Sequence, residues 1–284
     1  MQNNNWFTEA CAETGTAFSL EIHKKLHEEQ TPYQKIEIYS TKSFGNLMVI
    51  DGFIMLTERD NFIYHEMMSH PALFNHSKPR NIVIVGGGDC GTLLEVTKHS
   101  CVEKITQVEI DQRVTDLSLK YFPQLCVANS DPRVKLIFDD AIKWAKSAPA
   151  NSIDLIIVDS TDPIGPAKGL FSAPFYKDCF HALKTNGLLV QQSESPLIHL
   201  DRIIKPMHSC MLQAGFKKTQ LLNFPQSVYP SGWWSATIAS KDDTLHFFRE
   251  QESKSLKFET HYYNHAMHLA CFASPQFVLE KLKL

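Results

Sequence analysis

From residue 81 onward, short apolar runs alternate with gaps that are long enough to hold a helix. This alternation is typical of a parallel sheet whose strands are joined by crossover helices. The expected strands span residues 82–85, 104–109, 134–138, 155–159, 188–191, 217–222 and 235–240. Helices are expected near residues 91–98, 111–121, 141–147, 174–184 and 199–214, and a mostly helical tail follows residue 243. The sequence therefore predicts an α/β domain with a mostly parallel sheet over residues 76–284.

The first 57 residues follow a different pattern, because their apolar positions lie two apart, as in residues 18–22 and 33–39. Period two is typical of strands with one buried face. Asp51-Gly52, between two apolar runs, accepts the positive φ angles of a tight hairpin turn. Residues 58–75 carry apolar positions in helical phase and lead into a polar stretch that contains proline. We therefore expect a small antiparallel β-domain with a linking helix over residues 1–75.

Composition excludes several classes of partner. The 284 residues are 43% apolar with a net charge of −3, and no basic block tracks a phosphate backbone, which argues against nucleic acid. No apolar run approaches the roughly 18 residues of a membrane span. The seven cysteines form no C-x-x-C pair and indicate free thiols in a reducing cytoplasm. Histidines at 261, 265 and 268 share helical spacing but lack acidic or thiol partners, so no metal site is predicted.

Residues 153–166 join an apolar strand to two carboxylates. The strand ends on Asp159, and Asp162 follows in a loop rich in proline and glycine. Ligands of open α/β sheets bind at the carboxyl ends of the strands. Two acids there, with no basic residue between them, favour a cationic ligand. Taken singly, each aspartate has an ordinary alternative role, as a helix cap or in an Asx-turn.

Each of the first four parallel strands ends near an acid. Gly86, Gly88 and Gly91 follow the first strand as G-x-G-x-x-G, and Asp89 lies inside that turn. Glu109 ends the second strand, at the spacing of a ribose-binding carboxylate. The third strand ends at residues 139–140 and the fourth at residue 159. An acid inside the glycine turn repels a pyrophosphate, so the pattern favours S-adenosylmethionine or a derivative over a dinucleotide.

The chain closely resembles the spermidine synthases, the polyamine aminopropyltransferases. The resemblance rests on residues 33–34, 56–67, 86–89, 108–111, 159–166 and 229–232, and its most specific motifs are Thr-Glu-Arg-Asp at 57–60 and Asp-Ser-Thr-Asp-Pro at 159–163. It implies a methyltransferase-like Rossmann domain preceded by the β-domain, in a homodimer or homotetramer. It also implies aminopropyl transfer from decarboxylated S-adenosylmethionine, as co-substrate, to putrescine, with no permanently bound cofactor.

The resemblance further implies roles for individual residues. The resemblance implies that Asp159 is the general base and that Tyr64 and Asp89 are the other catalytic residues. It also implies that the nucleoside is bound by Gln34, Gly86, Gly88, Asp89, Glu109, Asp140 and Ala141. The same resemblance implies that the amine is bound by Tyr64, His65, Asp159, Asp162, Glu194 and Tyr229.

Two residues depart from the family pattern, and both departures concern the nucleoside pocket. Cys90 stands where the family usually has glycine, and a positive φ angle there would cost about 1–2 kcal/mol. Ala141 replaces the glycine usual after Asp140. Helix capping is the alternative role for Asp89 and for Asp140. Of the neighbours Trp233 and Trp234, at most one is expected to wall the amine channel, because adjacent strand residues face opposite ways.

Three rival functions deserve comparison. An S-adenosylmethionine-dependent amine N-methyltransferase would use the same scaffold, but Asp89 and Asp159 would repel the carboxylate of ordinary S-adenosylmethionine. An NAD-dependent dehydrogenase rests only on the glycine motif. A non-catalytic polyamine-binding protein would not need Tyr64 beside Asp159 and Asp162.

Overall fold

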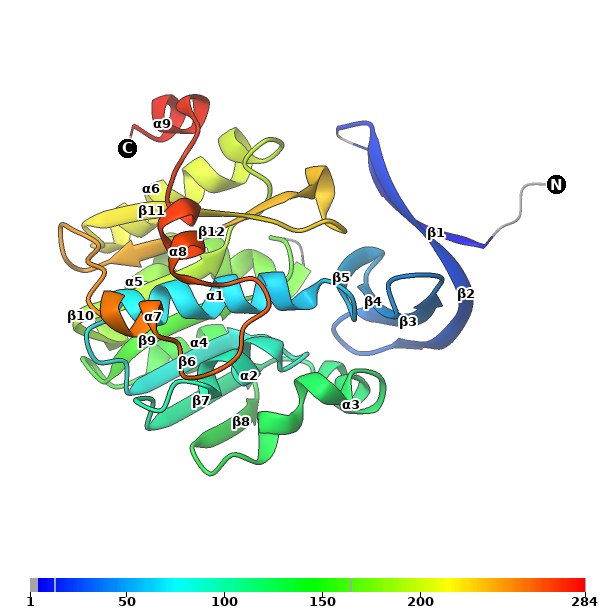
Figure 1. The fold of residues 1–284 in the computed structure, drawn as a ribbon, viewed down its shortest axis with the longest axis horizontal. Helices are drawn as coiled ribbons and strands as arrows, with labels where there is room; N and C mark the ends of the chain where they lie inside the picture. Colours follow the sequence, from blue (N-terminus) through cyan, green and yellow to red (C-terminus); the bar gives the residue numbers. More distant parts are fainter. Residues whose placement is uncertain (1–4, 13, 164, 284) are drawn as a thin grey trace.

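The computed structural model describes residues 5–12, 14–163 and 165–283 (Figure 1). Residue 164, in the loop after Asp159, therefore lies outside the described residues. The N-terminal strands are β1 (Trp6–Cys11), β2 (Thr16–Gln30), β3 (Lys35–Thr41), β4 (Asn46–Ile50) and β5 (Phe53–Thr57). They pair in chain order as an antiparallel sheet. Asp51 and Gly52 adopt φ angles of 51° and 88°, so the predicted hairpin turn is confirmed.

Helix α1 (Asn61–Asn75) leads from this sheet into the larger domain. It packs against helix α2 (Gly91–Thr97) and against strands of the second sheet, and nearly all of its side chains are buried. Its Glu66 is fully buried and accepts hydrogen bonds from the backbone N–H groups of residues 261, 262 and 263 at 2.7, 2.9 and 2.6 Å. The irregular centre of the tail is thereby anchored on α1. The division of the chain at residue 75 stays a prediction.

The second sheet contains β6 (Asn81–Gly86), β7 (Lys104–Glu109), β8 (Val134–Phe138), β9 (Ile153–Asp159), β10 (Leu183–Gln192), β11 (Lys218–Pro225) and β12 (Trp233–Ser240). Their order is β11-β12-β10-β9-β6-β7-β8. Strands β6 to β10 run parallel, and β12 is antiparallel to both of its neighbours. The predicted α/β fold class is confirmed.

The remaining helices alternate with the strands of the second sheet along the chain or follow its last strand. They are α3 (Gln112–Tyr121), α4 (Ala141–Ser147), α5 (Ala173–Ala182), α6 (Lys205–Ala214), α7 (Glu250–Lys254), α8 (His265–Cys271) and α9 (Gln276–Leu282). Short 3₁₀ turns span Pro123–Leu125, Val127–Ser130, Gly165–Phe171 and Pro230–Gly232, and a π-turn spans Leu200–Ile204. The stretch after Asp159 that is rich in proline and glycine was expected to be a loop, and this is wrong from residue 165 onward. Proline is compatible with the first turn of a helix, so it did not prevent this one.

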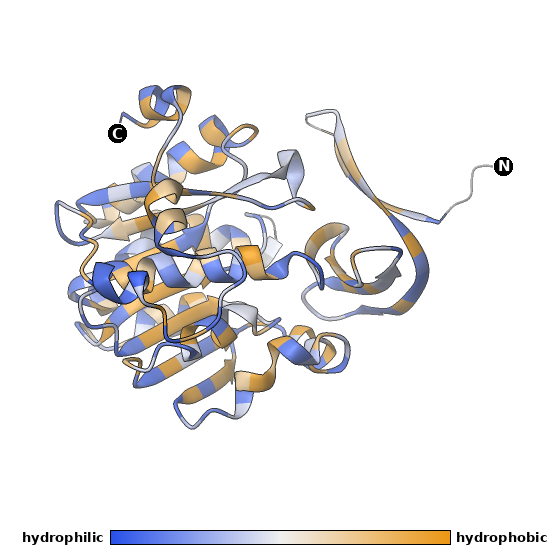
Figure 2. Cartoon of the chain, viewed as in Figure 1, coloured by the Kyte–Doolittle hydropathy of each residue, from blue (hydrophilic) through white to orange (hydrophobic). Residues whose placement is uncertain are grey.

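Central strands of the second sheet are buried on both faces. In β6, Ile82 and Ile84 pack into one apolar cluster with α1 and α2, whereas Val83 and Val85 pack into another with α4, α5 and α6. Strand β9 alternates in the same way, which explains why its residues 155–158 are all apolar. Figure 2 shows the hydrophobic residues concentrated along these strands. The double-sided core makes the carboxyl ends of β6 and β9 a rigid platform.

Candidate active site

The glycine turn after β6 is held against the end of β9. Gly86 and Gly87 have φ angles of 79° and 66°, and a Cβ atom on Gly86 would lie 2.2 Å from the backbone oxygen of Asp159. The N–H group of Gly87 donates to that same oxygen at 2.7 Å. Only glycine allows this approach. The turn therefore brings Asp89 close to Asp159.

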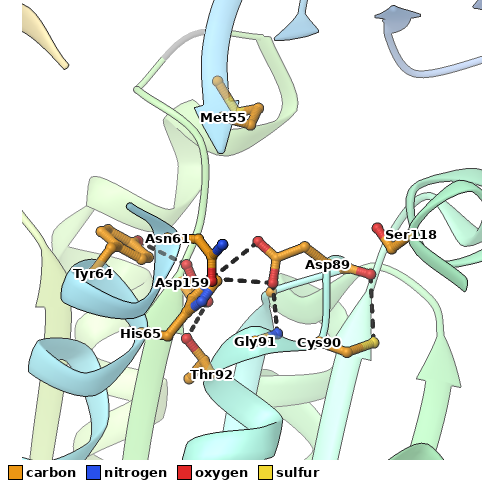
Figure 3. A network of polar contacts seen from close by, with 12 residues as sticks. Met55, Asn61, Tyr64, His65, Asp89, Cys90, Gly91, Thr92, Ser118 and Asp159 are labelled. Carbon is orange, nitrogen blue, oxygen red and sulfur yellow. Dashed lines mark hydrogen bonds and ion pairs between the residues drawn. The ribbon is translucent and has the colours of Figure 1, made fainter. Parts of the chain in front are cut away.

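Two hydroxyl groups hold the Asp159 carboxylate from opposite sides (Figure 3). The Tyr64 hydroxyl donates to Oδ1 at 2.7 Å, and the Thr92 hydroxyl donates to Oδ2 at 2.6 Å. Asp159 is buried, with 8% of its surface exposed. The sequence analysis missed Thr92, because a threonine in the first turn of a helix carries no signal of its own.

The Asp89 carboxylate is held by His65, which lies behind the cavity wall. The Nε2 atom of His65 lies 3.3 Å from both carboxylate oxygens, and the N–H group of Gly91 donates to Oδ1 at 2.7 Å. Burial by itself lowers the pKa of His65, but the facing Asp89 outweighs it and raises that pKa. Burial raises the pKa of Asp89, whereas His65 and the Gly91 N–H group bring it below its usual range. Cys90, not Asp89, is the N-cap residue of α2.

Two other acids of the site, Asp159 and Glu109, are harder to ionise. Burial raises the pKa of Asp159, and the nearby Asp89 raises it further. Burial also raises the pKa of Glu109 to about 7, although the N–H group of Asp111 donates to it at 2.9 Å. The pKa of Tyr64 lies well above its usual value because of burial and Asp159, so its hydroxyl stays a donor. No lysine, arginine or histidine is among the described residues that line the cavity beside these acids, so the cavity suits a cationic ligand.

One cavity contains every residue predicted to bind the nucleoside. Its lining includes Gln34, Gly86, Gly88, Asp89, Glu109, Asp140 and Ala141, together with Tyr64, Asp159 and Tyr229. The N-terminal sheet adds Met48, Ile50, Met55 and Leu56, which the sequence analysis assigned no role. The cavity thus lies between the two sheets, and β4 and β5 supply part of its apolar wall.

Asp140 caps a helix and also lies at the cavity, and its role in nucleoside binding stays a prediction. Its Oδ1 atom accepts from the backbone N–H groups of Ile142 and Lys143 at 2.9 and 3.4 Å and so caps α4, while the residue also lines the cavity. Ala141 is the first residue of α4 and places its methyl group at the cavity wall. Cys90 has a φ angle of 69°, so the expected left-handed conformation is confirmed, at a cost of about 1–2 kcal/mol.

A second cavity continues from the first beyond Tyr64. The two share Met55, Tyr64, Ser160, Thr161 and Tyr229, and the second is also lined by Glu9, Phe53, Ile54, Asp162, Gln192, Pro230 and Trp234. The Tyr229 hydroxyl donates to the backbone oxygen of Met55. Trp233 faces away and donates from Nε1 to Asn223 at 3.2 Å, so only Trp234 walls the channel.

Two predicted amine-site residues lie behind these walls. Neither His65 nor Glu194 lines either cavity. Glu194 has a φ angle of 67° and is 1% exposed, and its Oε2 atom lies 3.4 Å from Nδ1 of His199. Burial raises its pKa well above the usual value, and Asp162 adds to that shift. Their amine-binding roles stay predictions.

Two further kinds of feature are absent from the described part of the chain. No three His, Cys, Asp or Glu side chains in that part of the chain are grouped so that they could hold a metal ion. Among its helices, none combines the length and the apolar character that crossing a membrane requires.

The fold and the acidic cavity define a protein of the methyltransferase-like Rossmann class. Two family models match the chain: the spermine/spermidine synthase domain over residues 61–249 and the spermidine synthase tetramerisation domain over residues 5–58. The chain therefore belongs to the spermine/spermidine synthase family, and the resemblance predicted from its sequence is confirmed.

Relatives and solved structures agree with this assignment. The polyamine aminopropyltransferase of Thioalkalivibrio sulfidiphilus is 61% identical over 99% of this chain and 98% of the relative, and that of Methylococcus capsulatus is 57% identical over 98% and 97%. A spermidine synthase solved in complex with the transition-state analogue AdoDATO has a TM-score of 0.94 and 33% identity, covering 99% of this chain and 96% of its own. The spermidine synthase from Thermotoga maritima has a TM-score of 0.92 and 33% identity, covering 100% and 95%.

Proposed function

We propose that this protein is a polyamine aminopropyltransferase that makes spermidine and methylthioadenosine from putrescine and decarboxylated S-adenosylmethionine. Its relatives carry the name of that activity, and a structural neighbour was solved with a transition-state analogue. One observation carries the proposal for this chain. Asp159 is a buried carboxylate that hydrogen-bonds to Tyr64, a residue shared by two connected cavities.

The first cavity takes the nucleoside as a co-substrate, with no permanently bound cofactor. Glu109 accepts hydrogen bonds from the ribose hydroxyls, and Asp140 lies beside the adenine. Asp89 receives the ammonium of the aminopropyl group. The support for these roles is that all three acids line one cavity and that no cation among the described residues neutralises Glu109.

The reaction is a displacement at the carbon bonded to the sulfonium sulfur. The neutral amine nitrogen of putrescine forms a bond to that carbon, and the carbon–sulfur bond breaks with its electron pair going to sulfur. An alkyl ammonium has a pKa near 10.4, so its deprotonation at pH 7 costs roughly 4–5 kcal/mol. Asp159 accepts that proton, and its raised pKa makes it a stronger base. General base catalysis contributes about 10²–10⁴-fold, and alignment of the reacting atoms contributes more.

The two nitrogens of putrescine must be treated differently. The attacking nitrogen lies against Asp159 and Tyr64 and loses its proton. The remote nitrogen stays charged in the second cavity, where Asp162 lines the wall and Glu194 lies behind it. Tight binding of both ammonium groups as cations would instead suppress the reaction.

Assembly and location are part of the proposal. We infer a homodimer or homotetramer, supported by the match of residues 5–58 to a tetramerisation domain. We infer a cytoplasmic location, supported by the seven free cysteines.

Replacement of the proposed base tests the reaction. We expect Asp159→Asn to lower turnover with putrescine by at least about 100-fold, because the amide accepts no proton. Binding of decarboxylated S-adenosylmethionine, measured by calorimetry, should persist. Mass spectrometry of the wild-type reaction should show spermidine and methylthioadenosine. Unchanged turnover in the variant would exclude Asp159 as the base.

A further inference from the structure

The hydroxyl group of Thr92 has one hydrogen-bond partner among the described residues, and that partner is Asp159. Thr92 is the second residue of α2, is fully buried, and donates to Oδ2 of Asp159 at 2.6 Å (Figure 3). A threonine hydroxyl in a helix often bonds instead to the carbonyl oxygen four residues earlier. Here that oxygen belongs to Gly88 and already accepts from the Thr115 hydroxyl at 2.9 Å. The Thr92 hydroxyl therefore serves the carboxylate alone.

The two oxygen atoms of Asp159 have different surroundings. Oδ2 is enclosed between Thr92 and Gly87, where a Cβ atom on the glycine would lie 3.0 Å from it. Oδ1 accepts from Tyr64, a residue that lines both cavities, whereas Thr92 lines neither. The carboxylate thus turns one oxygen towards α2 and the other towards a residue that the two cavities share.

The charge on this carboxylate depends on the groups that donate to it. Burial and Asp89 raise the pKa of Asp159, whereas His65 and the hydroxyl groups of Thr92 and Tyr64 lower it. Loss of the Thr92 hydroxyl would therefore disfavour the ionised form. The titratable groups that face Asp159 are Tyr64 and His65 of α1, Asp89 of the glycine turn, Glu109 of β7, and Tyr229, which precedes β12.

We propose that Thr92 is a positioning residue for the reaction, whose hydroxyl fixes Oδ2 of Asp159 and so presents Oδ1 to the amine as the proton acceptor. This inference rests on the proposed function and adds a residue to it. The N–H bond of the attacking ammonium breaks with its electron pair staying on nitrogen, and the proton bonds to Oδ1. A carboxylate oxygen offers about two acceptor sites, so Oδ1 can take this proton while it accepts from Tyr64.

Thr92→Val tests the proposal, because valine keeps the shape of the side chain and removes the hydroxyl. The variable is kcat/KM for putrescine at saturating decarboxylated S-adenosylmethionine, measured at a series of pH values. We expect its acidic limb to move upward by about 1–2 pH units, the effect of one lost hydrogen bond to a charged group. Asp159 accepts a proton only when it is ionised, so activity should be lost below the new limb and recovered above it. The dissociation constant of decarboxylated S-adenosylmethionine, measured above the limb, should not change.

Two further variants separate the hydroxyl from the packing of the helix. Thr92→Ser keeps a hydroxyl at this position and should retain the wild-type acidic limb. Thr97→Val makes the same replacement in the same helix, where the hydroxyl donates to the carbonyl oxygen of Leu94 at 2.7 Å, and should also retain that limb. Each limb compares rates of one folded protein at different pH values, so a partial loss of stability does not move it.

The outcomes are distinct for the two proposals. Absence of spermidine formation by the wild-type protein would refute the proposed function itself. Spermidine formation by the wild type, with its acidic limb at the same pH in Thr92→Val, would overturn only the role of Thr92. An equal displacement of the limb in Thr92→Ser would overturn that role as well, because the hydroxyl would then not be its cause.

Discussion

Replacement of Tyr64 by phenylalanine tests the hydrogen bond on which the proposed role of Asp159 as base depends. The hydroxyl donates to Oδ1 of Asp159 at 2.7 Å in a buried setting. Because a hydrogen bond to a charged group contributes about 1.5–3 kcal/mol, its loss should raise the pKa of Asp159 by about 1–2 units. Burial and Asp89 already hold that pKa above its usual value, and Tyr64 opposes them.

The sign of the effect on activity follows from the role of the base. Asp159 accepts a proton only when it is ionised, so activity falls as the pH drops through its pKa. Tyr64→Phe should therefore move the acidic limb of the kcat/KM profile upward by about 1–2 pH units. Tyr64 itself does not titrate in this range, because its own pKa lies well above the usual value. The measurement is initial rates with putrescine at a series of pH values.

Tyr176→Phe provides a matched control. The Tyr176 hydroxyl is also buried and donates to Oε1 of Gln191 at 2.8 Å, away from Asp159. This variant should lose about 1 kcal/mol of stability and keep the wild-type pH profile. An acidic limb at the same pH in Tyr64→Phe and in the wild type would refute the assignment of that limb to Asp159.

Two further predictions concern stability. Glu109→Gln should raise the free energy of unfolding of the ligand-free protein by up to about 3 kcal/mol at pH 8. The reason is that the pKa of Glu109 is raised to about 7 in the folded protein, so the stabilising contribution of Glu109 is lost as the pH rises from about 4.5 through 7. Urea titrations should show no gain at pH 4, and nucleoside binding should weaken. Glu66→Ala should cost about 3 kcal/mol or more, because three backbone N–H groups lose their acceptor, whereas Glu103→Ala at the surface should have no effect. Equal unfolding midpoints for these two alanine variants would contradict the anchoring role of Glu66.

The parts of the site that follow the sheet were predictable from the sequence. Apolar runs identified β6 to β9, and parallel strands end at one edge, so Asp89, Glu109 and Asp159 had to converge there. The positive φ angle of Cys90 follows from its place in the glycine turn. A turn that requires a positive φ angle at one position imposes that angle on whichever residue stands there.

Hydrogen bonds between side chains and partners far apart in the sequence could not be predicted. Thr92 is separated from Asp159 by 67 positions and Glu9 from Ile54 by 45, so no local pattern links them. The resemblance assigned Glu194 to the amine, whereas its side chain lies buried behind the cavity wall, so that role stays a prediction. Burial depth depends on the elements that pack around a residue, and periodicity does not report it.

The buried acids of the ligand-free site lower the stability of the fold when they are ionised, and a bound cation relieves this cost. Asp159, Glu109, Glu194 and Glu9 all have raised pKa values, chiefly because of burial, so the folded protein gives up stability at neutral pH to keep these acids together. The apolar core on both faces of the central sheet offsets that cost. A bound cation lowers the pKa of each acid that it contacts, so nucleoside and diamine become the counter-ions that the folded chain lacks. Charge complementarity therefore links the stability of this fold to the presence of its substrates.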